Sequence, residues 1–254
     1  MLNAESGDGP FLRDGLVWRR VRPWSAGVQA LLGHLHANGF EAAPRAAGVD
    51  QAWERVTFLD GKTGDIETDA EMQSAAVLAS AARLLCRYHC CAAPVAVEWA
   101  SRAWQSSPRA PFLTICHGDF APYNVVLRDG EVSGIIDFET AHPGPRIWDL
   151  AYAVYRWAPL SAGAGSPLAG IDRQVERARL FLDEYGLDER LRAGVVATIV
   201  ARLERLVVFM QEQAANGSEK YRVDLAEGHD RVYRADIDYI SLHRQRIAAG
   251  MMPA

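Results

Sequence analysis

An Asp-Gly turn between two short apolar runs constrains this chain more than any other feature. Asp129-Gly130 is a typical two-residue hairpin turn, and residues 124–138 around it are rich in aliphatic and β-branched side chains. If the turn closes an antiparallel pair, Asn124 lies opposite Ile135, and Asp137 lies two residues further along the same face. Diagonal neighbours of this kind are about 7–8 Å apart. The hairpin therefore predicts that an amide and a carboxylate side chain lie close together.

These two side chains and one preceding carboxylate form a chemical set. Asn124 and Asp137 offer an amide oxygen and a carboxylate, which are the hard ligands that Mg²⁺ prefers. Asp119, five residues before Asn124, could accept or orient the proton of a substrate hydroxyl. Each residue alone is typical of a turn or a cap, but their joint occurrence beside a hairpin favours catalysis. We therefore predict Asp119 as the catalytic base and Asn124 and Asp137 as metal ligands for phosphoryl transfer.

Two linked motifs contain these residues, His117-Gly118-Asp119-Phe120-Ala121-Pro122-Tyr123-Asn124 and Ile136-Asp137-Phe138-Glu139. They resemble the motifs of the aminoglycoside phosphotransferase family, the small-molecule branch of the protein-kinase-like fold, and the resemblance is strongest over residues 75–157. It implies an α+β, two-lobe fold. The expected division is a short mixed N-lobe over residues 1–62 and a mainly helical C-lobe over residues 63–254. The resemblance also implies the same three roles for the carboxylates and the amide.

The expected N-lobe departs from the kinase pattern at the nucleotide phosphates. Kinase-like enzymes hold these phosphates with a strand lysine that pairs with a helix glutamate. Residues 16–39 contain no Asp or Glu, and no lysine stands in the corresponding strand. Arg19 occupies the basic position and can clamp a phosphate through two nitrogens, with Arg20 as an alternative. By resemblance, Phe58 and Leu59 would hold the base of ATP or GTP at the hinge.

Three further polar residues accompany the motifs. His117 is expected to be a buried imidazole that bonds backbone groups and positions Asp119. Glu139 follows Asp137 by two residues and could contact the substrate or a neighbouring group, or be a plain surface carboxylate. Asp149 is expected to cap or brace the helix that contains it.

Charge and hydropathy exclude several classes of partner. The 254 residues carry a net charge of −5 without a cluster of basic residues, so nucleic-acid binding has no electrostatic support. The acidic balance fits a cationic substrate slightly better than an anionic one. No apolar run approaches the roughly 18 residues of a membrane span, and the first ten residues lack the features of a signal peptide.

The four cysteines are few and clustered, which favours a reduced, cytoplasmic protein. Cys86, His89 and Cys90 share one face of an expected helix and could be imagined as zinc ligands. No fourth ligand is apparent, and cysteine is a common buried residue in such helices.

The remaining pattern predicts a strand-rich beginning and a helical remainder. Strands are expected over residues 11–13, 16–22, 44–49 and 53–59, and helices over 26–38, 69–91, 147–157, 171–185, 189–215 and 221–249. In the family that the chain resembles, the late helices help to form the wall of the acceptor pocket.

The function that the sequence predicts is a phosphotransferase. It would move the γ-phosphoryl group of a magnesium-bound nucleotide to a hydroxyl of a small molecule, such as an antibiotic, a sugar or an amino alcohol. The alternative is a pseudokinase or ligand-binding module with weak or no nucleotide binding, which the missing lysine–glutamate pair favours. A scaffold that acts through protein contacts is a third reading. The sequence indicates neither the acceptor nor the oligomeric state.

Overall fold

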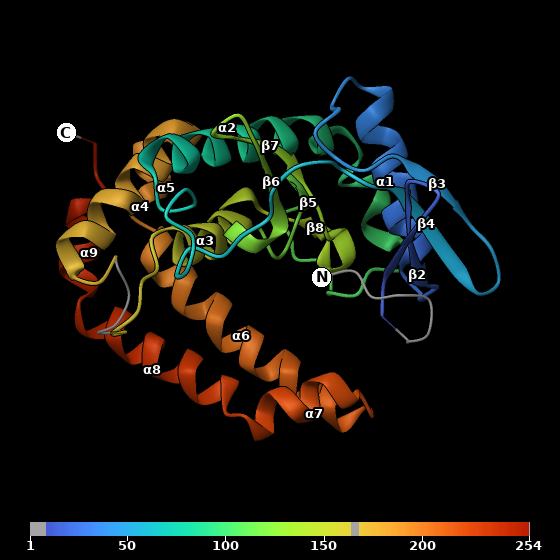
Figure 1. Cartoon of the computed structure of the whole chain (residues 1–254). Helices are drawn as coiled ribbons and strands as arrows, with labels where there is room; N and C mark the ends of the chain where they lie inside the picture. The colour runs from blue at the N-terminus through green and yellow to red at the C-terminus, as the bar shows by residue number, and fades with distance from the viewer. Residues whose placement is uncertain (1–8, 164–167, 254) are drawn as a thin grey trace.

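The computed structural model describes residues 9–163 and 168–253. A four-stranded antiparallel sheet lies at one end of the molecule, and helices form most of the remainder (Figure 1). Helix α1 (Ser25–Ala37) packs against the sheet. The expected α+β class is confirmed. In the spatial order of the sheet, the strands are β1 (Phe11–Arg13), β2 (Leu16–Arg20), β4 (Trp53–Thr57) and β3 (Ala46–Val49).

The helices after the sheet follow the expected order with different boundaries. The helix expected over 171–185 forms with the same bounds, whereas 189–215 and 221–249 are divided. Gly194 separates α5 from α6, and Gly228, with a φ of 86°, separates α7 from α8. Within the described part of the chain, no helix is both long and apolar enough to cross a membrane. The helices are α2 (Ala75–Ala92), α3 (Arg146–Trp157), α4 (Ile171–Tyr185), α5 (Glu189–Arg192), α6 (Val195–Ala215), α7 (Glu219–Ala226), α8 (His229–Leu242) and α9 (Arg244–Gly250).

Helix α2 begins at Ala75, so the expected start at Asp69 is wrong. Ser74 explains the later start, because its side-chain oxygen accepts a hydrogen bond of 3.2 Å from the Val77 amide. This is an N-cap, which satisfies one of the amides that a helix start leaves without a partner.

Both expected Asp-Gly turns form. Asp129 and Gly130 have φ values of 54° and 78°, and they join β6 (Val125–Arg128) to β7 (Glu131–Ile135). Asp14-Gly15 joins β1 to β2 with φ values of 52° and 72°. Two successive residues at positive φ are what a type I′ hairpin turn requires, and its twist matches that of the strands.

The register of the β6–β7 hairpin differs from the prediction by one residue. Arg128 pairs with Glu131 as expected, but the register shifts between Val126 and Leu127. Val125 therefore lies opposite Ile135, and the expected pairing of Asn124 with Ile135 is wrong. A bulge of this kind places one extra residue in one strand, which no local sequence signal announced here.

The bulge leaves both expected metal ligands just outside the strands. Asn124 ends a short 3-10 turn (Pro122–Asn124), and Asp137 follows the end of β7. They are still neighbours, because the Ile136 amide donates a hydrogen bond of 3.0 Å to the Asn124 carbonyl. A second small sheet, β5 (Thr114–Cys116) with β8 (His142–Gly144), anchors the loops that precede and follow this hairpin.

One hydrophobic core continues from the sheet end of the molecule into the helices. Leu31 of α1 and Val56 of β4 belong to the same buried cluster as Leu85 of α2 and Phe138. Helix α2 packs against α4, β5 and β7. The hairpin is thus held by packing from both parts of the fold, while α6, α7 and α8 lie together on the other side of the molecule from α2 (Figure 1).

Candidate active site

A buried carboxylate fixes the loop that carries the first motif. Asp149 on α3 accepts hydrogen bonds from the backbone amides of His117 (2.7 Å) and Gly118 (2.8 Å). It also lies 2.9 Å from His89 Nε2, and the Tyr185 hydroxyl lies 2.8 Å from His89 Nδ1. The expectation that Asp149 braces its own helix is wrong. It braces the loop instead, and the two contacts of His89 leave it no free nitrogen for the zinc site considered with Cys86 and Cys90.

The charge states of this pair follow from burial and hydrogen bonding. Burial alone would raise the pKa of Asp149, but the hydrogen bonds from His89 and the Gly118 amide outweigh it and lower the pKa to about 2. Burial lowers the pKa of His89 below its ordinary value of 6.5. The folded protein therefore holds an ionised Asp149 beside a neutral His89.

Two residues of the loop shape its backbone. His117 is completely buried, with Nε2 3.0 Å from the Ile136 carbonyl and Nδ1 3.3 Å from the Asp119 amide. It is thus a buried imidazole in contact with backbone, as expected, and it does not line the cavity described below. Gly118 has a φ of 85°, and a Cβ at this position would lie 2.5 Å from the Thr140 carbonyl oxygen. Only glycine fits there without a shift of the backbone.

The carboxylate of Asp119 is held at both oxygens. The Asn124 amide nitrogen donates to Oδ2 (2.8 Å), and the Tyr123 hydroxyl donates to Oδ1 (2.9 Å). The Tyr123 hydroxyl also lies 3.2 Å from that of Tyr152. Burial is the main cause that raises the pKa of Asp119 above 3.8, and the charge of Asp137 adds to it. Sequence reasoning did not find either contact; Tyr152 is 4% exposed and also belongs to the hydrophobic core.

Asp137 adopts a backbone conformation that residues other than glycine rarely take. Its φ and ψ are 62° and 67°, in the left-handed region, and no glycine follows to explain them as a turn. Such conformations cost about 1–3 kcal/mol and concentrate at functional sites. The Asp137 side chain is half exposed, and its Oδ1 lies 3.5 Å from an Arg19 nitrogen.

Arg19 has an acidic partner that the sequence analysis did not find. Glu54 lies directly opposite Arg19 in the β2–β4 pair, and its Oε1 is 2.9 Å from Arg19 Nε. Glu54 is only 3% exposed. Helix α1 contains no acidic residue, as the sequence indicated, and the partner of Arg19 comes from the neighbouring strand β4 instead. Arg20 points elsewhere and stacks over Trp53, with its guanidinium carbon 4.2 Å from the ring centroid.

This ion pair yields a stability prediction. We expect Arg19→Ala to lower the free energy of unfolding by about 3–5 kcal/mol, because it strands the buried Glu54 charge. The other carboxylate oxygen of Glu54 is buried and has no hydrogen-bond partner among the described residues, so Arg19 is its main compensation. Arg20→Ala is the matched control and should cost about 1 kcal/mol or less. Urea denaturation of both variants measures the difference, and equal losses would contradict the assignment.

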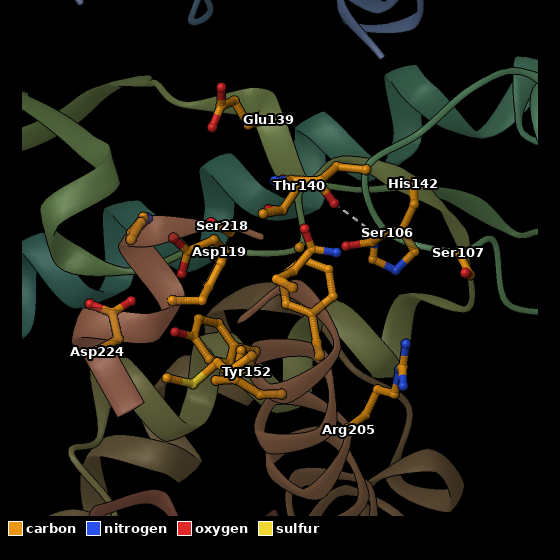
Figure 2. Close-up of a pocket in the computed structure, with 18 of the residues that line it drawn as sticks. Ser106, Ser107, Asp119, Glu139, Thr140, His142, Tyr152, Arg205, Ser218 and Asp224 are labelled. Atoms are coloured by element: carbon orange, nitrogen blue, oxygen red, sulfur yellow. Dashed lines mark hydrogen bonds between the residues drawn. The ribbon is translucent and has the colours of Figure 1, made fainter. Parts of the chain in front are cut away.

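A cavity of about 1170 Å³ opens in front of the loop. Figure 2 shows Asp119 and Tyr152 among its walls, with Glu139 and Thr140 from the segment after Asp137. Asn124 and Asp137 also line it, so the three predicted chemical residues share one cavity. Burial raises the pKa of Glu139, followed by the charge of Asp137. Glu139 is thus part of the cavity wall and not a plain surface carboxylate.

The predicted nucleotide contacts fall into two groups. Arg19 reaches the edge of the cavity through Asp137. Phe58 and Leu59 do not line the cavity: Phe58 is 39% exposed, and Leu59 lies against Gly134 of the hairpin. A base held near Phe58 and Leu59 would therefore lie beside this cavity, on the sheet side of the hairpin.

The residues present fit a magnesium ion. The Asn124 nitrogen is committed to Asp119, which leaves the amide oxygen as the ligand atom that Asn124 can offer. Asp137 adds a half-exposed carboxylate on the same cavity wall. One or two protein oxygens beside nucleotide phosphates are a typical magnesium environment.

Comparison with known proteins agrees with this geometry. Residues 93–193 match the phosphotransferase enzyme family (APH). A trifolitoxin immunity protein from Rhizobium leguminosarum bv. trifolii is 28% identical over 220 residues, which cover 83% of this chain and 80% of the relative.

Two solved structures share the fold at low identity. A choline/ethanolamine kinase family protein from Mesorhizobium loti aligns with a TM-score of 0.60 and 15% identity, over 96% of this chain and 89% of that one. The streptomycin–ATP–APH(2'')-IIa ternary complex aligns with a TM-score of 0.56 and 14% identity, over 94% of this chain and 91% of that one. The expected kinase-like fold, with an antiparallel sheet followed by a mainly helical region, is confirmed. The chain thus has the kinase-like fold, and its residues 93–193 are similar to the APH phosphotransferase family.

Proposed function

We propose that this protein transfers the γ-phosphoryl group of a magnesium-bound nucleotide to a hydroxyl of a small molecule, with Asp119 as the catalytic base. One observation carries the proposal. Both carboxylate oxygens of Asp119 accept a hydrogen bond, which fixes the side chain. Asp119 lines a large cavity together with Asn124 and Asp137. A carboxylate in this position could orient the hydroxyl of an acceptor that binds in the cavity.

The roles follow from position and charge. The acceptor hydroxyl would donate its proton to Asp119 while its oxygen forms a bond to the γ-phosphorus, and the bond to the β-phosphate bridging oxygen would break to release the nucleoside diphosphate. Burial raises the pKa of Asp119, which makes it a better proton acceptor than an ordinary carboxylate. Arg19 would contact the phosphates, with Glu54 holding its guanidinium in place. A magnesium ion held by Asn124 and Asp137 would offset the negative charge of the phosphates.

The nucleotide and the cellular compartment belong to the same proposal. ATP or GTP would place its base on the sheet side, near Phe58 and Leu59. One structural relative is a complex with ATP. All four cysteines are free thiols in the structure, which supports the proposal of a reducing, cytoplasmic environment.

A second candidate is a binding module that protects without phosphoryl transfer. Two observations favour it: the relative named for trifolitoxin immunity, and the position of Phe58 and Leu59 outside the cavity wall. In this reading the cavity would hold a toxin or another ligand, with weak or no nucleotide binding. The same relative makes a toxin one of the acceptors to test for the transferase.

Nucleotide binding separates the two candidates. We expect ATP or GTP with magnesium, at 100 times its dissociation constant, to stabilise the protein by about 2.7 kcal/mol. Asp137→Ala should abolish the magnesium-dependent part of this shift, because it removes one of the two proposed ligands. Thermal unfolding with and without magnesium gives both values. Silence toward every nucleotide would support the binding module and remove the transferase.

A further inference from the structure

Two guanidinium groups lie over one indole in the wall of the cavity. Arg109 lies over Trp148 with its guanidinium carbon 3.8 Å from the ring centroid, and Arg202 lies 5.6 Å from the same centroid. All three residues line the cavity. We call Arg109, Trp148 and Arg202 the cationic corner. Stacking uses the face of a guanidinium and leaves its edge able to donate two parallel hydrogen bonds.

Asp149 directly follows Trp148 in the chain, but its carboxylate oxygens contact His89 and the amides of His117 and Gly118, not the arginines of this corner. In the described part of the chain, neither Arg109 nor Arg202 forms an ion pair. Arg202 Nε is buried and has no hydrogen-bond partner there. A buried N–H without a partner costs about 1–3 kcal/mol, so a ligand that accepts from it would be favoured.

The other charged residues of the cavity wall mostly have partners of opposite charge. Apart from the three carboxylates near phosphoryl transfer, the acidic lining residues are Glu219 and Asp224, and each has a basic neighbour, Arg222 and His229 respectively. Arg205 also lines the cavity, but Glu212 holds it through two contacts of 3.0 and 2.7 Å. At the cationic corner the cavity therefore offers positive charge that has no ion-pair partner among the described residues.

The cationic corner is close to the proposed base. Arg202 donates a hydrogen bond of 2.7 Å to the carbonyl of Gly118, the residue before Asp119. His142, which is 3% exposed, lines the same cavity as both arginines. Burial lowers its pKa, and the charges of Arg202 and Arg109 act in the same direction. Its Nδ1 contacts the Thr140 carbonyl at 2.8 Å (Figure 2). A group bound at the corner would thus lie near a hydroxyl placed at Asp119.

We propose that the cationic corner binds an anionic group of the acceptor, so that the substrate class is a small hydroxyl compound carrying a carboxylate or another oxyanion. This inference rests on the proposed function for the hydroxyl and adds the charge of the molecule that bears it. It reverses the slight preference for a cationic substrate that the net charge of −5 suggested. The reason is local: neither arginine of the corner has an ion-pair partner among the described residues, whatever the net charge of the whole chain.

Sulfate is a suitable probe because it presents oxyanion geometry without a hydroxyl. Thermal unfolding in sodium sulfate is compared with sodium chloride at equal ionic strength. We expect a saturable stabilisation by sulfate in the wild type, weakened at least 5-fold in apparent affinity by Arg109→Gln and at least 10-fold by Arg202→Gln. Arg202→Lys keeps the positive charge but loses the two parallel N–H donors of the guanidinium, so its apparent affinity for sulfate should be intermediate. An equal response of all these proteins, or no specific response in the wild type, would overturn the anion site.

Arg102→Gln is the matched control for charge and stacking. Arg102 lies over Trp99 with its guanidinium carbon 4.3 Å from the centroid, outside the cavity, and this variant should respond to sulfate like the wild type. Arg109 is exposed, so Arg109→Gln should fold even if Arg202→Gln does not.

Measurement of nucleotide binding distinguishes failure of the proposed phosphotransferase function from failure of the proposed anion site. Magnesium–ATP should stabilise the wild type and Arg109→Gln equally. Loss of nucleotide binding with sulfate binding intact would remove the transferase and leave the anion site. Nucleotide binding without sulfate binding would remove the anion site and leave the transferase. In an ADP-release assay, acceptors drawn from D-gluconate, D-glucose and D-glucosamine should favour the anion, and a preference for the cation would count against the proposal.

Discussion

Asp119→Asn is expected to reduce the rate of phosphoryl transfer by about 100- to 10,000-fold while leaving nucleotide affinity nearly unchanged. Asparagine keeps the size of the side chain but cannot accept the proton of the acceptor hydroxyl. The carboxylate of Asp119 is held by Tyr123 and Asn124, and among the described residues no hydrogen bond or ion pair joins it to Arg19. ADP release measures turnover, and thermal shift with magnesium–ATP measures binding. Turnover equal to wild type would contradict the role of Asp119.

Tyr123→Phe is the control that tests the base without removing it. The Tyr123 hydroxyl lowers the pKa of Asp119 by donating to its ionised form. Its loss should raise that pKa, so the acidic limb of the pH–rate profile should move to higher pH while turnover at its plateau stays within a few-fold of wild type. A merely structural role of Tyr123 would change stability without moving this limb.

The sequence could predict the central hairpin because its signals are local. The Asp129-Gly130 turn is encoded in two adjacent residues, and both adopt the positive φ that the turn type demands. The register could not be predicted to one residue, because the bulge between Val126 and Leu127 depends on packing around the hairpin. Asn124 and Asp137 share the cavity, but they reach it through a 3-10 turn and a left-handed residue instead of the expected strand register.

The partners of the predicted residues were harder to infer, since they are distant in sequence. Arg19 was identified from its place in a strand, but Glu54 could be assigned only once β2 and β4 were paired. The hydrogen bond from Gly118 to Asp149 spans 31 positions, and the contact of Asp149 with His89 spans 60. The three residues of the cationic corner come from a loop, the start of α3 and α6. No local sequence pattern in these segments predicts that they meet.

The interaction network of Asp149 predicts the largest change in stability. We expect Asp149→Asn to lower the free energy of unfolding at pH 7 by about 3–5 kcal/mol, because it leaves buried donors without a charged acceptor. The carboxylate accepts from two backbone amides and contacts His89, whereas an asparagine would turn an NH₂ group toward one of these donors. Since the amides belong to His117 and Gly118, the variant should also lose turnover through displacement of Asp119.

The pH dependence of unfolding tests the same network independently. Asp149 has a pKa of about 2 when folded against 3.8 otherwise, so its contribution of about 2–3 kcal/mol is present above pH 3.8 and is lost as the pH falls toward 2. The lowered pKa of His89 means that its contribution is present above about pH 6.5 and declines below it. Urea denaturation from pH 7 downward should therefore show a stability that falls with acid, and Asp149→Asn should flatten the part below pH 4. Asp172→Asn, at an exposed ion pair with Arg246, is the matched control and should change stability by less than about 1 kcal/mol. If the two variants were equally stable, Asp149 would not be the group that holds the loop.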